Sequence, residues 1–311
     1  MAQSGPTHLL SSYYAPRGAH RMYALGQHLA QLYLNPTDKL IGIIGEAGSG
    51  KSALIRGMLP GLELTNDDNG VYIRPLPILE QDRSFAFFSP HTYHLDIRFE
   101  NGFTQMTELA DAISEALDKG KRVIVEHFDL IYPILGANAN LLIGVGEQVL
   151  VARPNIFGPE PEEIRNEVYR TLPYRLMAHT AEDICGMFID DADNERCGHA
   201  DLRHGFAITF PETEPNIDLA QLEAKVNDII AQDLPVTYVN ENHISIGDCV
   251  QLCDGPRVHV HRTGQIENFR LMNHLMYDRF KRHYVLVGCV GEKSDELLDK
   301  LEDRRQRPGW D

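Results

Sequence analysis

The first half of the chain alternates between stretches with helical periodicity and short continuous apolar runs. Apolar residues recur every three or four positions at 20–34, 53–58 and 109–117, which predicts amphipathic helices. The runs at 40–44 and 123–125 are too short for helices and rich in β-branched residues, so they predict buried strands. Helices that alternate with buried strands indicate an α/β domain with a mainly parallel sheet and flanking helices.

The second half follows a segment rich in proline and glycine, residues 154–163, which predicts a linker. The elements predicted after it are a helix at 162–188 that can break at Pro173, a strand at 206–210, a helix at 218–232 and a strand at 236–239. We therefore expect an α/β domain at residues 18–155 and an α+β module at residues 164–305. Residues 61–90 are rich in loop formers, with one short strand predicted at 71–73.

Length and composition fit two globular domains. A chain of 311 residues with 43% hydrophobic and 24% charged positions has the size and balance that two domains need. The net charge of −16 argues against a broad nucleic-acid-coating surface, because phosphate contacts need clustered lysines and arginines. It leaves room for a small local tRNA-contacting patch.

The cysteines and the apolar runs indicate the compartment. The five cysteines, an odd number, all lie in the second half: Cys185, Cys197, Cys249, Cys253 and Cys289. The start of the chain lacks the pattern of a signal peptide, so we expect thiols in a reducing compartment. The longest apolar stretch, near residues 141–151, is too short and too interrupted to span a bilayer. We expect a cytoplasmic protein without a membrane partner.

One stretch carries a specific chemical pattern. The strand at 40–44 leads into Gly-x-x-x-x-Gly-Lys-Ser, and helical spacing follows. In such a P-loop the glycines let several backbone N–H groups converge on a phosphate, the lysine reaches β- and γ-phosphate oxygens, and the serine hydroxyl binds Mg²⁺. The residues that we expect to bind ATP are Gly45, Glu46, Ala47, Gly48, Ser49, Gly50, Lys51 and Ser52.

Two carboxylates follow predicted strands. Asp96 lies in an alternating stretch at 92–97, and Glu126 comes directly after the run at 123–125. Ligands of nucleotide-binding α/β sheets sit beyond the carboxyl ends of the strands, so both should converge with the loop. There Asp96 and Ser52 would bind Mg²⁺, and Glu126 would position an attacking water. With Lys51, these two carboxylates are the candidate catalytic residues, although a solvated strand-end role stays open for each.

The order of these features resembles the small ATPase of the tRNA threonylcarbamoyladenosine modification pathway, the TsaE type. The matching segments are Leu-Gly-x-x-Leu-Ala at 25–30, the P-loop, Arg56-Gly57, Tyr-His-x-Asp at 93–96 and the strand that ends at Glu126. The resemblance spans residues 18–155 and implies a Mg²⁺-dependent ATP hydrolase that works with other tRNA-modification proteins. The chain departs from the family at Ser52, where Thr is usual, at His127, where Trp is usual, and at 62–90, where a Ser-Pro-Thr segment is not recognisable.

The second half resembles the second additional domain of threonyl- and alanyl-tRNA synthetases, the editing module that hydrolyses mischarged tRNA. The matching residues include Gly205, Phe206, Cys253, Gly255, Pro256, Val258, Thr263, Gly264, Ile266 and Phe269. The resemblance implies an α+β fold that contacts tRNA or aminoacyl-tRNA, with a catalytic cluster of three histidines and one cysteine. Of that cluster the chain keeps His179 and Cys253, whereas Asp183 and Arg257 take the other two positions.

Two histidines near this segment, His259 and His261, could replace the missing ones. A tetrahedral Zn²⁺ site is then conceivable from His179, Asp183, Cys253 and His259. Arg257 argues against a metal, because a guanidinium carries a permanent positive charge and cannot ligate. We therefore expect a degenerate editing site whose fold is kept to recognise a tRNA end or an aminoacyl-nucleotide, and ordinary packing roles for His179 and Cys253 stay open.

These patterns together predict an ATP-binding P-loop ATPase linked to tRNA modification or aminoacyl-tRNA quality control. One alternative is a kinase for a small nucleoside-type or amino-acid acceptor, because P-loops serve both reactions. A second is a zinc-dependent aminoacyl-tRNA deacylase. A third is a non-catalytic tRNA-binding regulator, against which the acidic net charge counts.

Overall fold

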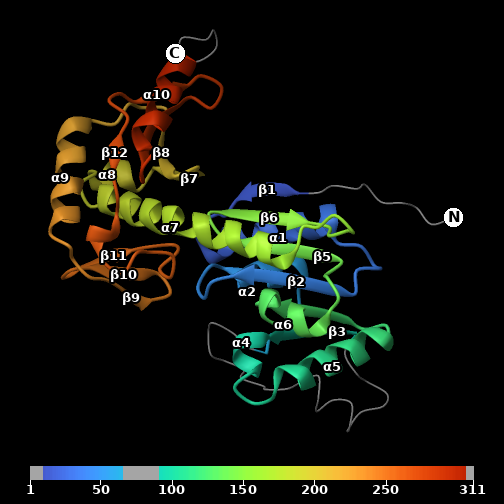
Figure 1. Ribbon diagram of the computed structural model, residues 1–311. Coiled ribbons are helices and arrows are strands. Elements are labelled where there is room, and N and C mark those ends of the chain that lie inside the picture. Colours follow the sequence, from blue (N-terminus) through green and yellow to red (C-terminus); the bar gives the residue numbers. More distant parts are fainter. Residues whose placement is uncertain (1–9, 66–90, 306–311) are drawn as a thin grey trace. The chain divides into compact units, whose positions relative to one another are not determined.

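The chain forms two compact units in the computed structural model, which describes residues 10–65 and 91–305 (Figure 1). The first unit takes the residues before Pro16 together with Ala19–Arg170, and the second takes Pro16–Gly18 and the residues from Thr171 on. The division falls inside the long helix α7 (Pro161–Gly186) and not in the predicted linker at 154–163. The reason is that the first turns of α7 bury Ile164 and Val168 in the core of the first unit.

A six-stranded, mostly parallel sheet forms the centre of the first unit, in the order β1-β6-β5-β2-β4-β3. Its strands are β1 (Ser11–Tyr14), β2 (Leu40–Gly45), β3 (Thr92–Asp96), β4 (Arg122–Glu126), β5 (Leu141–Val145) and β6 (Gln148–Ala152). Strands β5, β2, β4 and β3 are parallel to their neighbours in that series, whereas β6 and β1 add antiparallel at one edge. The predicted α/β architecture is confirmed, although the patterns did not predict β1, β5 or β6.

Helices pack on both faces of this sheet. Those of the first unit are α1 (Ala19–Tyr33), α2 (Lys51–Met58), α4 (Ile97–Glu100), α5 (Met106–Asp118) and α6 (Phe128–Leu135). Helices α1 and α2 share one core with the sheet, and α5, α6 and the start of α7 share the other. Along β2, Ile41 and Ile43 join the first core, whereas Leu40 and Ile44 join the second. Because successive strand residues point to opposite faces, burial on both faces explains why β2 is apolar throughout.

Two glycines let α1 and α2 approach closely. A Cβ on Gly26 of α1 would lie 2.2 Å from the carbonyl oxygen of Leu54, and one on Gly57 of α2 would lie 2.0 Å from that of Tyr23. Any larger residue would force the helices apart. The Leu-Gly and Arg-Gly pairs, which the sequence presented as separate motifs, are thus the two halves of one helix contact that holds the helix after the P-loop.

The second unit is an α+β module. Its strands are β7 (Gly198–Leu202), β8 (Gly205–Pro211), β9 (Val236–Asn240), β10 (His243–Ile246), β11 (Cys249–Leu252), β12 (Arg270–Leu271), β13 (Met276–Asp278) and β14 (His283–Cys289). Its helices, besides the end of α7, are α8 (Asp191–Asn194), α9 (Leu219–Ala231), the 3₁₀ turn η1 (Thr263–Gln265) and α10 (Ser294–Arg305). Strands β12, β14, β8 and β7 form an antiparallel sheet with β13 paired to β14, and β11, β10 and β9 form another.

Most of the elements predicted for the second half are present. The predicted strands at 206–210 and 236–239 correspond to β8 and β9, and the predicted helix at 218–232 corresponds to α9. Helix α7 does not break, since Pro173 lies inside it. The strand predicted at 71–73 lies outside the described residues. Within the described part of the chain, no helix is both long enough and apolar enough to cross a lipid bilayer.

Candidate functional site

The loop at residues 45–52, for which the sequence predicts a P-loop, joins the end of β2 to the start of α2. Two of its glycines have positive φ, 75° at Gly48 and 98° at Gly50, where a Cβ would be strained. Gly50 is the N-cap of α2, so the N-terminus of the helix opens within the motif, at Lys51. The glycines therefore produce the backbone bend that the sequence predicted.

Few of the backbone amides of this loop bind to the protein itself. Ala47 N donates to the Glu46 side chain at 3.0 Å, and Ser49 N donates to the Glu46 carbonyl at 3.2 Å. The amides that have no acceptor among residues 10–65 and 91–305 are those of Gly48, Gly50, Lys51 and Ser52. Unpaired N–H groups at the N-terminus of a helix favour an anion such as a phosphate.

The Lys51 side chain lies against the loop and is only 5% exposed. Its Nζ donates to the backbone carbonyl of Glu46 at 2.9 Å and lies 3.4 Å from Oε2 of Glu126. Glu126 ends β4, the strand next to β2, and stands in register with Asp96 on β3. Parallel strands thus bring Lys51 and both predicted carboxylates to one edge of the sheet, as the motif order indicated.

Glu126 is held by a second partner, His94 on β3. Its Oε1 lies 3.1 Å from Nε2 of His94, whose Nδ1 in turn lies 3.2 Å from the backbone N of Thr65. Burial alone would raise the pKa of Glu126, but the His94 hydrogen bond and the charge of Lys51 outweigh it and lower the pKa to about 2. Glu126 is therefore a carboxylate at neutral pH, with one oxygen anchored by His94.

Asp96 and His127 complete this group. Asp96 Oδ1 caps α4 by accepting two of its backbone N–H groups, the nearer being that of Arg98 at 3.0 Å. Asp96, Glu126 and His127 each offer a ligand atom, and these atoms lie within 4.8 Å of one another. Burial lowers the pKa of His127 to about 4, as do the charges of Lys51 and Arg98, so its imidazole is neutral. Its φ of 57° is uncommon for a residue with a side chain. We call Lys51, His94, Asp96, Glu126 and His127 the phosphate-loop cluster.

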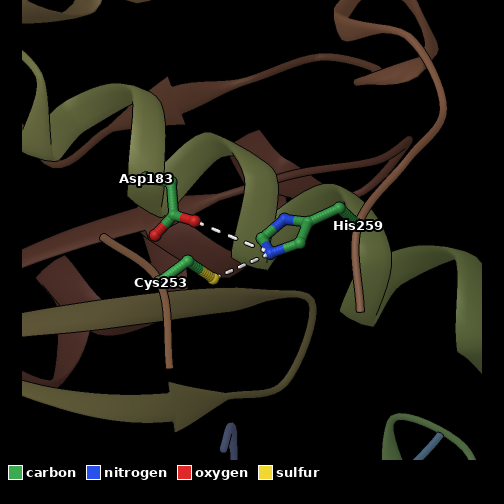
Figure 2. Close-up of side chains that lie close together, drawn as sticks. All are labelled: Asp183, Cys253 and His259. Carbon is green, nitrogen blue, oxygen red and sulfur yellow. Dashed lines mark hydrogen bonds and ion pairs between the residues drawn. The ribbon is translucent and has the colours of Figure 1, made fainter. Parts of the chain in front are cut away.

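The second unit contains another buried group, which Figure 2 shows. Asp183 comes from α7, Cys253 follows β11, and His259 lies six residues after the cysteine. Nε2 of His259 is 3.2 Å from the Cys253 sulfur and 3.6 Å from Oδ2 of Asp183, so both contacts converge on one ring nitrogen (Figure 2). Aspartate, cysteine and histidine are all zinc ligands.

A guanidinium lies in the same group. The NH2 nitrogen of Arg17 donates to Oδ1 of Asp183 and, at 3.1 Å, to the Cys253 sulfur, and its NH1 donates to Glu182 at 2.9 Å. Arg17 is 4% exposed. Burial opposes its charge, but the Asp183 and Glu182 carboxylates outweigh burial and hold the pKa of Arg17 well above its ordinary value. As folded, the site holds a fixed cation and does not fit a metal ion. We call Arg17, Thr180, Asp183, Cys253 and His259 the arginine cluster.

Burial has the largest influence on the pKa values of the two titratable side chains near Arg17, those of His259 and Cys253. It lowers the pKa of His259 to about 3, where the Arg17 charge acts in the same direction and Asp183 opposes it. Burial also raises the pKa of the Cys253 thiol to about 11, helped by the Asp183 charge and opposed by Arg17. At neutral pH the imidazole and the thiol are therefore both uncharged.

The structure corrects the expected roles of His179 and Arg257, and it decides between His259 and His261 as the histidine of the arginine cluster. His179 is not one of the three residues whose ligand atoms lie together, since its Nε2 lies 3.0 Å from Asp201. The guanidinium of Arg257 lies over the Tyr238 ring, 4.7 Å from its centroid, and the one that contacts Cys253 belongs to Arg17. Of the two histidines considered, His259 is buried in the cluster and His261 is exposed.

Sequence reasoning gave no role to His94, His127 or Arg17. His94 had a detectable signal, because it stands two residues before Asp96 in a strand and therefore on the same face. His127 directly follows Glu126 and was noted only as a departure from the family pattern. Arg17 had no signal, because its partners lie more than 160 residues away along the chain.

Comparison with known proteins adds no family to this picture: no protein-family model matches the chain, and no curated protein matches it.

Proposed function

We propose that the first unit binds a nucleoside triphosphate with Mg²⁺, with ATP as the expected nucleotide, and hydrolyses it at the phosphate-loop cluster. The observation that carries the proposal is the position of Lys51. Its ammonium lies between a loop carbonyl and the Glu126 carboxylate, beside amides that have no acceptor among the described residues. An ammonium on a flexible stem can exchange these two partners for phosphate oxygens by a small movement. This arrangement supports the proposal of a P-loop nucleotide site.

Donors suited to a divalent cation come from the cluster and from Ser52, the residue that follows Lys51. The carboxylates of Asp96 and Glu126 and the hydroxyl of Ser52 are oxygen donors, which Mg²⁺ prefers. The neutral imidazole of His127 is a better ligand for softer metals. We therefore assign Mg²⁺ to Ser52 and Asp96. The bound ion would supply charge neutralisation on the phosphates.

Glu126 is the residue that would orient the attacking water. While Lys51 is within 3.4 Å of Oε2, that oxygen is engaged, and it becomes available when the lysine moves to the phosphates. Oε1 stays bonded to His94, which keeps the carboxylate from rotating. His94 is thus a positioning residue. In this scheme nucleotide binding itself frees the oxygen that hydrolysis needs.

The Lys51→Ala variant tests the proposal by calorimetry with ATP and Mg²⁺. Loss of a charged phosphate contact should weaken binding about 10- to 100-fold. Lys119→Ala, which removes an exposed lysine paired with Glu115, is the matched control and should bind as the wild type does. Equal affinity of the wild type and Lys51→Ala would refute the assignment. Labelled γ-phosphate that appears as inorganic phosphate supports hydrolysis, and its appearance on a small metabolite would identify a kinase.

We further propose that the second unit recognises a tRNA end or an aminoacyl group without hydrolysing it. This proposal is supported by the resemblance of residues 253–269 to the editing module and by the cation that Arg17 places in its cluster. ATP turnover that rises on adding tRNA or aminoacyl-tRNA would support it. Release of free amino acid from mischarged tRNA would instead point to the deacylase.

A further inference from the structure

We propose that the guanidinium of Arg17 takes the place of a metal ion among Asp183, Cys253 and His259, and that removing it turns the cluster into a three-ligand Zn²⁺ site. This inference concerns the second unit alone and does not depend on nucleotide binding by the first. It assigns Arg17 as the built-in cation of the cluster and predicts a metal affinity that the wild-type chain lacks.

The spacing of the ligand atoms fits zinc. Ligand atoms bound tetrahedrally at about 2.0–2.3 Å lie roughly 3.3–3.6 Å apart. Nε2 of His259 lies 3.2 Å from the Cys253 sulfur and 3.6 Å from Oδ2 of Asp183. Both distances from the histidine nitrogen thus fit zinc, and the sulfur and the carboxylate oxygen lie within 4.8 Å of each other. A water would be the fourth ligand.

The tautomer of His259 also suits a ligand. Thr180 Oγ1 donates its one proton to the Leu176 carbonyl at 2.8 Å and accepts the backbone N–H of Val260 at 3.1 Å. Its contact with Nδ1 of His259, at 3.2 Å, must therefore be donated by the imidazole. The proton then sits on Nδ1, so Nε2 presents its lone pair to Cys253 and Asp183. A zinc-bound histidine is commonly oriented in this way, by a hydrogen bond from its second nitrogen.

The exchange preserves charge. Arg17 carries +1, and Zn²⁺ bound to one thiolate also sums to +1. Zinc binding to a variant with a neutral residue at position 17 would form a Zn–S bond, break the S–H bond and release one proton to solvent. Asp183 stays a carboxylate in both states, because a cation lies next to it in each. The surrounding charges therefore need no other change.

Close backbone packing holds Arg17 in its position beside Cys253. A Cβ on Gly255 would lie 2.9 Å from Cγ of Arg17, and one on Gly18, whose φ is +86°, would lie 3.0 Å from the Asp254 carbonyl oxygen. Arg175 donates to the carbonyl of Pro16 at 3.2 Å. Two glycines and a buried arginine thus hold the segment 16–18 against residues 254–255, so the guanidinium is a fixed part of the cluster.

The Arg17→Met variant tests the proposal, because methionine is flexible, apolar and uncharged. We expect it to bind one Zn²⁺ per chain after dialysis, measured by elemental analysis, with an affinity at least about 100-fold above that of the wild type. Co²⁺ should give a thiolate-to-metal absorption band with this variant, and the double variant Arg17→Met/Cys253→Ser should lose the band. Arg17→Lys keeps the charge and should bind no metal. Arg196→Met, which neutralises an arginine outside the cluster, is the matched control and should behave as the wild type.

Several results would overturn the proposal. One is stoichiometric zinc in the wild-type chain that disappears with Cys253→Ser, a measurement that does not depend on how any Arg17 variant folds. Another is a folded Arg17→Met chain that binds no more zinc than the wild type. An Arg17→Met chain that remains unfolded with zinc present also counts against it, because the metal should restore the missing charge.

Discussion

The two units each hold a buried cation in contact with a carboxylate, but the two cations are held differently. Lys51 in the phosphate-loop cluster contacts one backbone carbonyl and one carboxylate, and loop amides without an acceptor among the described residues lie beside it. Arg17 in the arginine cluster bonds two carboxylates and a sulfur, with glycines fitted around its segment. In the proposed function a ligand completes the phosphate-loop cluster, whereas the arginine cluster is already completed by the chain itself.

The difference shows that similar residue types do not imply similar chemistry. Histidine, aspartate and a neighbouring carboxylate or thiol occur in both clusters, and both have a group of three potential metal ligands. What separates them is whether the local cation can leave at little cost. Moving the lysine breaks one hydrogen bond and one contact of 3.4 Å, and Glu126 keeps its bond to His94. Removing the guanidinium leaves Asp183 without its cation, while Glu182 keeps only His199, at 2.7 Å.

The largest expected effect concerns Glu126 in the phosphate-loop cluster. Glu126→Gln removes the carboxylate that would orient water, so single-turnover ATP hydrolysis should fall about 10²- to 10⁴-fold while ATP affinity changes only slightly. Glu115→Gln, an exposed glutamate on α5, is the control and should keep full activity. If both variants hydrolyse ATP as the wild type does, the phosphate-loop cluster is not a hydrolytic site.

The second prediction compares the unfolding free energies of variants that lack one of the two cations, measured without added metal. Arg17→Met leaves Asp183 without its cation, while Glu182 keeps its contact with His199, and the unfolding free energy should fall by about 3–5 kcal/mol. Lys51→Ala leaves Glu126 bonded to His94 and should cost roughly 1–2 kcal/mol. Denaturant unfolding of both variants measures the difference. If both variants lost the same unfolding free energy, Arg17 would be no more important to its cluster than Lys51 is to the phosphate-loop cluster, which contradicts the comparison.

The smallest effect is a pH dependence that comes from His259. Its pKa is about 3 in the folded chain against an ordinary 6.5, so the unfolded chain takes up a proton first as the pH falls. The stability from this histidine is complete above pH 6.5 and declines towards pH 3, by about 1 kcal/mol between pH 7 and 5.5. His259→Gln should flatten this part of the acid profile. His261→Gln, at an exposed position two residues away, should not; equal profiles for both would contradict the assignment.

Local patterns alone predicted three of the six strands of the first unit, β2, β3 and β4, and the bend of the loop at residues 45–52. Runs of β-branched residues, helical spacing and glycines act through the backbone of neighbouring residues, so β2, α2 and β4 could be located from the sequence. The convergence of Lys51, Asp96 and Glu126 followed from a rule about strand ends. The roles of Gly26 and Gly57 did not, because a close helix contact depends on two segments that meet only after folding.

The sequence by itself determined part of the elements, among them β2, β4 and α9, the glycine-lysine motif at 45–52 and the types of residue available near positions 179–183 and 253–261. Only the tertiary structure decided that His259 and not His261 joins Cys253, that His179 pairs with Asp201, and that Arg17 supplies the charge first assigned to Arg257. The physical reason is the separation along the chain over which each kind of interaction acts. Backbone preferences act over a few residues, whereas the contact of Arg17 with Cys253 closes a separation of 236 positions and depends on packing that no local pattern records.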